Sequence, residues 1–159
     1  MANSPKIYPQ GKIYQKMKEF EWLDRVLIIS PVLYALCLTQ EAFTKELKRL
    51  KIKVSQEDSL FLIKGARATT HTFAMDNDAV VCIVCMPIDL ALSEVEVYAT
   101  LTHEAVHVWQ EIKQVLGEEK PGIEQEAYSI ESIAYRLMHS YYKNNALHRR
   151  CYKKLKGKG

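Results

Sequence analysis

The sequence predicts an α+β domain, in which N-terminal helices precede a small antiparallel β-sheet and two longer helices follow it. Three patterns predict this class: a helix with clear start and stop signals over about 94–116, two strand-like runs just before it, and helical periodicity on both sides. The 159 residues, 48% of them hydrophobic and 26% charged, fit one globular, soluble domain.

The helix over about 94–116 has the strongest local signals. Ser93 and Glu96 form a capping-box pattern, in which each side chain satisfies a backbone N–H of the other residue. Gly117 is a typical C-terminal stop. Apolar residues recur between them at helical spacing: Val97, Leu101, Val108, Ile112 and Val115.

The segment before this helix predicts further elements in order. Residues 1–12 read as an arm, and apolar residues spaced along 13–29 indicate an amphipathic helix. Ser30 and Pro31 fit the start of a further helical turn. Thr39 fits the N-cap of a helix over about 40–51.

Two runs then indicate a β-hairpin. The run 66–74 alternates loosely and is rich in β-forming residues, whereas 79–86 is continuously apolar, as in a buried strand. The residues between them, Met75-Asp-Asn-Asp78, favour a turn. A last helix is predicted over about 121–145.

The helix over 94–116 carries the pattern His-Glu-x-x-His at His103, Glu104 and His107. On a helix the two histidines lie one turn apart on the same side, so both imidazoles can reach one Zn²⁺ at about 2.0–2.1 Å. Glu104 lies about 100° further round, where its carboxylate could accept a proton from a metal-bound water as a general base.

A zinc site of this kind needs a third protein ligand, and the stretch 122–131 offers Glu124, Glu126 and Glu131. Helical periodicity favours Glu126, because it shares a stripe with apolar residues while the other two point away. A carboxylate on an apolar stripe is costly without a partner, and zinc would be one. The alternative is a first-turn glutamate that interacts favourably with the helix dipole.

His-Glu-x-x-His, eighteen further residues and then Glu126 resembles the motif of the gluzincin metallopeptidases, such as the thermolysin-like and aminopeptidase-type enzymes. The resemblance covers about 76–140, and the chain length is similar to that of small phage and prophage proteins with a minimal gluzincin core. It implies a zincin-like active-site helix, a C-terminal ligand helix, Zn²⁺ as cofactor and a peptide or protein substrate. One of the predicted strands would then line the cleft and pair with that substrate.

The resemblance also implies a tyrosine or histidine that stabilises the oxyanion, and Tyr128 is the tyrosine nearest to Glu126 in sequence. His71, in the predicted hairpin, could also face the cleft. Two departures stand out: Ile130 occupies the position of a common acidic residue, and the Gly-x-Met-Glu-Asn substrate motif is absent.

The cysteines and the apolar segments indicate the cellular compartment of the protein. Cys82 and Cys85 have the spacing of a zinc knuckle but lack a second pair, and they read as apolar strand residues in a reducing, cytoplasmic compartment. Residues 1–12 contain no apolar core of a signal peptide. The apolar run 26–38 is too short for a transmembrane segment and is interrupted by Pro31.

The charge is uneven, with six Lys or Arg and no acid in 149–159, so the remaining residues sum to −3. The sequence therefore predicts one domain over 1–148 and a basic, disordered tail over 149–159. Such a tail leaves nucleic-acid contact as an alternative function. Two others are a regulatory protease specific for one protein partner and a non-enzymatic zinc-bearing interaction protein.

Overall fold

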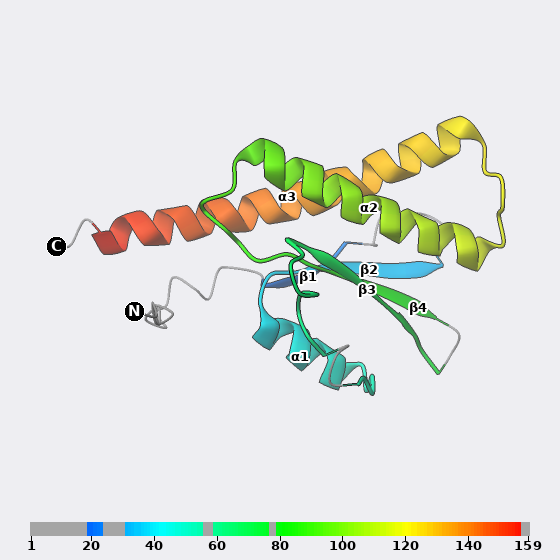
Figure 1. Ribbon diagram of the computed structural model, residues 1–159, viewed down its shortest axis with the longest axis horizontal. Helices are drawn as coiled ribbons and strands as arrows, with labels where there is room; N and C mark the ends of the chain where they lie inside the picture. Colours follow the sequence, from blue (N-terminus) through cyan, green and yellow to red (C-terminus); the bar gives the residue numbers. More distant parts are fainter. Residues whose placement is uncertain (1–18, 24–30, 56–58, 77–78, 157–159) are drawn as a thin grey trace.

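The computed structural model describes residues 19–23, 31–55, 59–76 and 79–156, with only the helical backbone for 147–156. Figure 1 shows how the elements within these residues are arranged. In chain order they are β1 (Phe20–Trp22), β2 (Val32–Cys37), α1 (Gln40–Arg49), β3 (Thr69–Ala74), β4 (Val80–Cys85), α2 (Glu94–Leu116) and α3 (Ile123–Lys156).

The four strands form one mixed sheet in the order β1-β2-β4-β3. The central strands β2 and β4 are parallel, with Val32 opposite Val80 and Cys37 opposite Cys85. The outer strands β1 and β3 each pair antiparallel with their neighbour. The α+β class is confirmed, but the prediction of an antiparallel sheet was wrong at the central pair.

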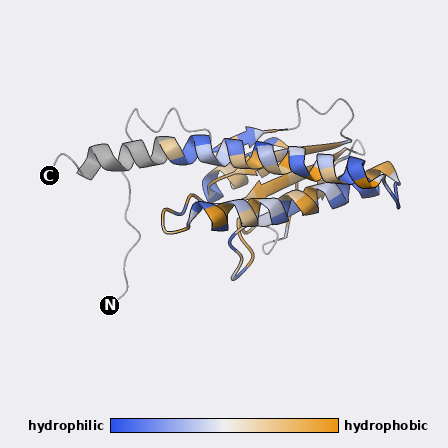
Figure 2. Cartoon of the chain, turned by 90° about the horizontal axis from the view of Figure 1, so that it is seen from above, coloured by the Kyte–Doolittle hydropathy of each residue, from blue (hydrophilic) through white to orange (hydrophobic). Residues whose placement is uncertain are grey.

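Helices cover both faces of this sheet. Helices α2 and α3 lie along one face and α1 lies against the other (Figure 1). Because β2 and β4 are buried on both faces, nearly all of their residues are apolar, and Figure 2 shows these hydrophobic strands behind the helix pair. The larger core, between the sheet and the helix pair, includes Tyr34, Val84, Leu101 and Leu137.

The N-terminal predictions were wrong where the structure tests them. Residues 20–22 of the predicted helix form β1, which pairs with β2. Pro31 does not begin a helical turn but directly precedes β2. The predicted arm over 1–12 and the parts of the helix at 13–18 and 24–29 lie outside the described residues.

The middle of the chain follows its local signals. Thr39 caps α1 by accepting a hydrogen bond from the Ala42 backbone N–H at 3.2 Å. The predicted hairpin is present as β3 and β4. Helix α2 has the predicted bounds, a complete capping box at Ser93 and a left-handed C-cap at Gly117, where φ is 66°.

The last helix is longer than predicted. Helix α3 has 34 residues and continues to Lys156, so the segment 149–159, predicted as a disordered tail, is helical over most of its length. Helices α2 and α3 pack together along the sheet (Figure 1). None of the helices within the described residues is long and apolar enough to cross a membrane.

Candidate functional site

His103 and His107 lie side by side on the exposed surface of α2. Their Nε2 atoms are 3.0 Å apart, and their ring centroids are 4.7 Å apart. On the other side of the His107 ring, Nδ1 lies 3.2 Å from Oε1 of Gln110, one turn further along the helix. The two imidazoles therefore lie one turn apart on the same side of α2, as their spacing predicted.

The packing of α2 explains why the histidines are exposed. Ala105, Val108 and Ile112 are buried against the rest of the core. At about 100° per residue, these positions lie roughly 100–200° round the helix from His103 and His107. The two histidines therefore lie outside the buried face of α2.

Glu104, in contrast, lies on the buried side of α2, and only 4% of its surface is exposed. Its Oε2 accepts a hydrogen bond of 2.6 Å from the hydroxyl of Thr70 in β3. Strand β3 is the outer strand of the sheet on that side. The carboxylate is thereby held between α2 and the sheet, roughly 60–100° round the helix from the two imidazoles.

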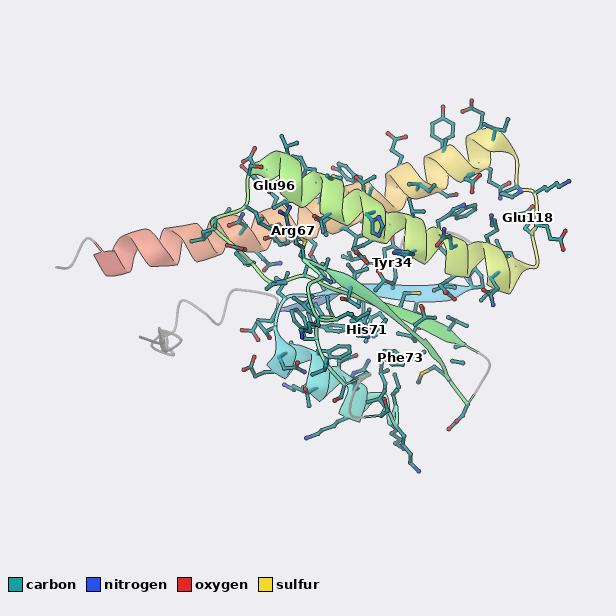
Figure 3. The ribbon with its side chains drawn as sticks, in the orientation of Figure 1. Tyr34, Arg67, His71, Phe73, Glu96 and Glu118 are labelled. Carbon is teal, nitrogen blue, oxygen red and sulfur yellow. The ribbon has the colours of Figure 1, made fainter. Side chains whose placement is uncertain are left out.

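The segment just before β3 forms an ion pair with α2. Nη1 of Arg67 lies 3.1 Å from Oε1 of Glu96, in the first turn of the helix (Figure 3). Both side chains are largely solvated, so we expect this pair to contribute little to the free energy of unfolding. Glu96 lies about two turns before Glu104 along α2 and roughly 80° round the helix from it.

The separation of the two histidine nitrogens is close to that of two ligands of one zinc ion. Two nitrogens bound at about 2.0–2.1 Å with a tetrahedral angle are roughly 3.3–3.4 Å apart. The observed separation of 3.0 Å differs from this by an amount that a small rotation of either ring would supply. Both rings are exposed, so an ion has direct access to them.

The predicted third ligand is not brought to this pair. Oε1 of Glu126 accepts a hydrogen bond of 2.8 Å from Nε1 of Trp109, and Nζ of Lys113 lies 4.0 Å from the same oxygen. Trp109 is about 200° round α2 from His107, so Glu126 contacts the opposite side of that helix. Within the described part of the chain, no three His, Cys, Asp or Glu side chains come together to hold a metal.

Two candidate cleft residues also lie elsewhere. Tyr128 is exposed, and it is about 200° round α3 from Glu126, so its side chain points away from α2. His71 is on the other face of β3, facing α1 (Figure 3), where its ring centroid is 4.7 Å from that of Phe43 and its Nε2 is 3.3 Å from the carbonyl of Phe61. Neither position supports an oxyanion role.

The cysteines behave as apolar strand residues. Cys37, Cys82 and Cys85 are buried free thiols, and Cys82 and Cys85 both lie in strand β4. Burial raises the pKa of the Cys82 thiol to about 12. Burial also raises the pKa of Cys85, which lies beside Cys37 on the neighbouring strand. Thiols of this kind are poorly reactive.

Two residues that contact the candidate carboxylates, Thr70 and Trp109, were not predicted from the sequence. Thr70 contacts Glu104 from 34 positions away, and Trp109 holds Glu126 through the packing of α2 against α3. Both contacts depend on how distant elements dock, which local spacing does not encode. A buried glutamate on a predicted helix was the one available signal, because such a group needs a donor nearby.

No protein-family model, no curated protein and no solved structure matches the chain. The chemistry of His103, Glu104 and His107 is therefore inferred from their geometry.

Proposed function

We propose that the protein is a zinc-dependent hydrolase of peptide bonds, with His103 and His107 as metal ligands and Glu104 as the general base. The observation that carries this proposal is the 3.0 Å separation of the two exposed Nε2 atoms, with Glu104 next to His103 along the helix. Zinc bound there would supply a Lewis acid that activates water for attack on a carbonyl.

The contacts of Glu104 support its proposed role as the general base. A base must lie within hydrogen-bond reach of the proton it takes, or within one water of it. The hydrogen bond from Thr70 restricts the rotation of the carboxylate, and burial excludes most of the solvent that would compete for it. Its role would be to accept a proton from water and to donate it to the leaving amine.

Strand β3 supports a peptide as the substrate class. In the described sheet it has a neighbour on one side only, and it contacts the same turn of α2 that carries the histidines. An extended peptide that adds to such an edge gains backbone hydrogen bonds along its length. Its scissile bond would then lie near Glu104.

The two histidines supply fewer protein ligands than the three that catalytic zinc sites usually have. Glu126 does not complete the set in this arrangement, because Trp109 holds it on the other side of α2. We therefore propose the histidines as the metal-binding residues and separate metal binding from hydrolysis in the experiments.

The first experiment measures metal. Zinc content after dialysis and zinc affinity by calorimetry would be compared for the unchanged chain, a His103→Ala/His107→Ala variant and a His139→Ala control, whose histidine is exposed on α3. We expect about one zinc per chain in the first and third proteins and none in the second. Full zinc occupancy in the double variant would place the metal elsewhere.

The second experiment measures hydrolysis with a peptide library. Glu104→Gln keeps the shape of the side chain but removes the base, so we expect bound zinc to be retained and cleavage to fall by about 10²–10⁴-fold. Cleavage of one protein partner, without cleavage of any library peptide, would favour the regulatory protease. Zinc binding without any cleavage would instead favour the non-enzymatic zinc-bearing protein.

A further inference from the structure

The outer face of α3 carries three tyrosines at a spacing of seven residues. Tyr128, Tyr135 and Tyr142 are 66%, 67% and 55% exposed. Seven residues correspond to nearly two full turns, so the three side chains lie within about 40° of one another along roughly 21 Å of helix. We call these three residues the tyrosine stripe.

The tyrosine stripe is opposite the face of α3 that packs on the core. Ile133, Leu137 and Tyr141 on the other side of the helix are almost completely buried. Within the described residues the stripe is covered by nothing, and its middle member stacks on His139 with ring centroids 6.1 Å apart. Three large rings in a row are more than the scattered surface aromatics that a monomer usually exposes.

The two ends of the same helical segment have opposite charge. Residues 123–131, at the start of α3, contain three Glu and no Lys or Arg, for a net charge of −3. Residues 139–156 contain six Lys or Arg and no acid, for a net charge of +6. An antiparallel pair of such helices places acid against base twice, whereas a parallel pair places like charges together.

We propose that the tyrosine stripe binds the stripe of a second copy of this chain, as an antiparallel helix pair whose twofold axis passes near Tyr135. With this axis, Tyr128 lies opposite Tyr142 of the second copy and Glu131 lies opposite its His139. The same surface is used on both copies, as twofold symmetry requires. Offset or edge-to-face contacts between the rings would add to the burial of their area.

The expected dimer is weak and sensitive to salt. The exposed parts of three tyrosines supply on the order of 300–450 Å² per copy, against about 800 Å² per partner in a standard stable interface. The remainder must come from flanking residues and from the charge complementarity, which salt screens. The histidine pair lies on the side of α2 away from α3, so the dimer leaves it open and does not depend on the proposed hydrolysis.

Sedimentation equilibrium over a wide concentration range at low salt would measure the association. We expect a reversible dimer that weakens as salt is added. Tyr135→Ala, which removes both rings at the axis, should weaken it by about tenfold or more. Tyr98→Ala on α2 is the matched control and should have no effect. A chain that stays monomeric at every concentration would overturn the proposal, as would a monomer that uses these tyrosines to bind single-stranded RNA.

Cysteine cross-linking tests the orientation. In a Cys151→Ser background, Tyr128→Cys and Tyr142→Cys variants would be oxidised separately and as a mixture. The antiparallel pair predicts a cross-linked heterodimer in the mixture and little cross-linking of either variant alone. Efficient cross-linking of each variant with itself would indicate a parallel pair and would overturn the proposed arrangement.

Discussion

At the scale of single residues, Glu104 is the group on which the site depends most. A carboxylate that is removed from water carries a large desolvation cost unless a donor replaces the lost hydrogen bonds. Thr70 supplies one such donor, at 2.6 Å. The hydrogen bond therefore stabilises the fold and orients the proposed base at the same time.

Replacing Thr70 by Val should separate these contributions from packing, because the two side chains have nearly the same shape. We expect Thr70→Val to lower the free energy of unfolding by about 1–3 kcal/mol, since it leaves a buried acceptor without its donor. Urea unfolding would measure this. Thr72→Val is the control, because Thr72 lies on the same face of β3 but is exposed, and its hydroxyl makes only a weak contact, 3.7 Å from Sγ of Cys82. Equal losses in the two variants would contradict the role given to Thr70.

Glu126 is the residue whose observed contacts differ most from the predicted ones. Its carboxylate contacts Trp109 and Lys113 on the side of α2 away from the histidines. We expect Glu126→Gln to leave the zinc content unchanged, because an amide oxygen can still accept the hydrogen bond from Trp109. His107→Ala, measured by the same metal analysis, should lose the ion. Loss of zinc in Glu126→Gln would show that α3 rearranges to supply a third ligand.

At the scale of elements, the sequence predicted those helices whose signals are local. The ends of α2 follow from Ser93, Glu96 and Gly117, and the start of α1 follows from Thr39. His103 and His107 were predicted for the same reason, because a spacing of four on a helix fixes their relation.

The strands β1 and β2 were missed because their structure depends on distant partners. Strand β2 is a short apolar run after a Ser-Pro pair, a pattern that a helical turn also fits. Its parallel pairing with β4 involves residues about fifty positions away. The same limit explains the third ligand: the apolar stripe around Glu126 was read correctly, but its partner proved to be Trp109.

The capping box of α2 should be sensitive to acid. The Glu96 carboxylate accepts hydrogen bonds from the backbone N–H and the hydroxyl of Ser93, and these lower its pKa below the usual 4.5. A lowered pKa means that the contribution is complete above about 4.5 and is lost as the pH falls through the folded-state value.

We therefore expect Ser93→Ala to lower the free energy of unfolding by about 1 kcal/mol at neutral pH, and by less as the medium becomes more acidic. Urea unfolding across a pH series would measure both values. In a Glu96→Gln background the cost of Ser93→Ala should no longer vary with pH in this range. A cost that stays constant in the unchanged chain would mean that the carboxylate does not take part in the cap.

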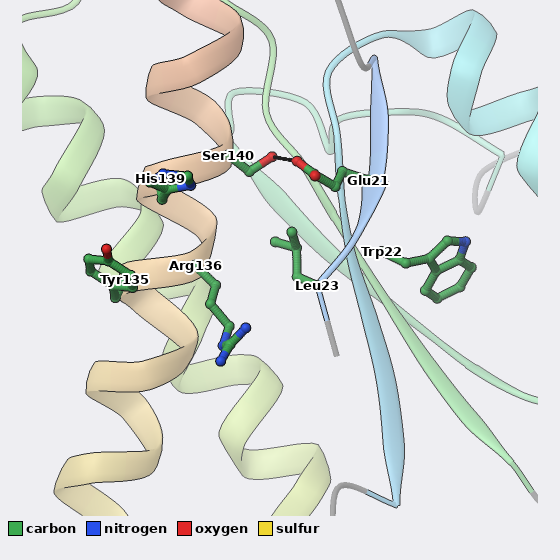
Figure 4. A pocket seen from close by; sticks show the side chains of 7 residues that line it. All are labelled: Glu21, Trp22, Leu23, Tyr135, Arg136, His139 and Ser140. Atoms are coloured by element: carbon green, nitrogen blue, oxygen red, sulfur yellow. Dashed lines mark hydrogen bonds between the residues drawn. The ribbon is translucent and has the colours of Figure 1, made fainter. Parts of the chain in front are cut away.

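At the scale of the whole molecule, one hydrogen bond joins the first described strand to the last helix. The hydroxyl of Ser140 in α3 donates to Oε2 of Glu21 in β1 at 2.6 Å, across 119 positions of sequence (Figure 4). Ser140 is almost completely buried, and its carbonyl accepts a further hydrogen bond from Asn144. The bond joins an outer strand of the sheet to α3, so it helps to set how α3 lies along the sheet.

A double-mutant cycle would measure this link. Hydrogen bonds to a charged group contribute about 1.5–3 kcal/mol, so we expect a coupling free energy of that size between Glu21→Ala and Ser140→Ala in urea unfolding. Asn144→Ala with Glu21→Ala is the control cycle, because Asn144 contacts Ser140 through the backbone, and it should show little coupling. Because the bond joins the two ends of the fold, its loss should also reduce the protection of β1 from hydrogen exchange more than that of α1. A coupling near zero, with equal exchange in both elements, would mean that β1 is held by its pairing with β2 alone.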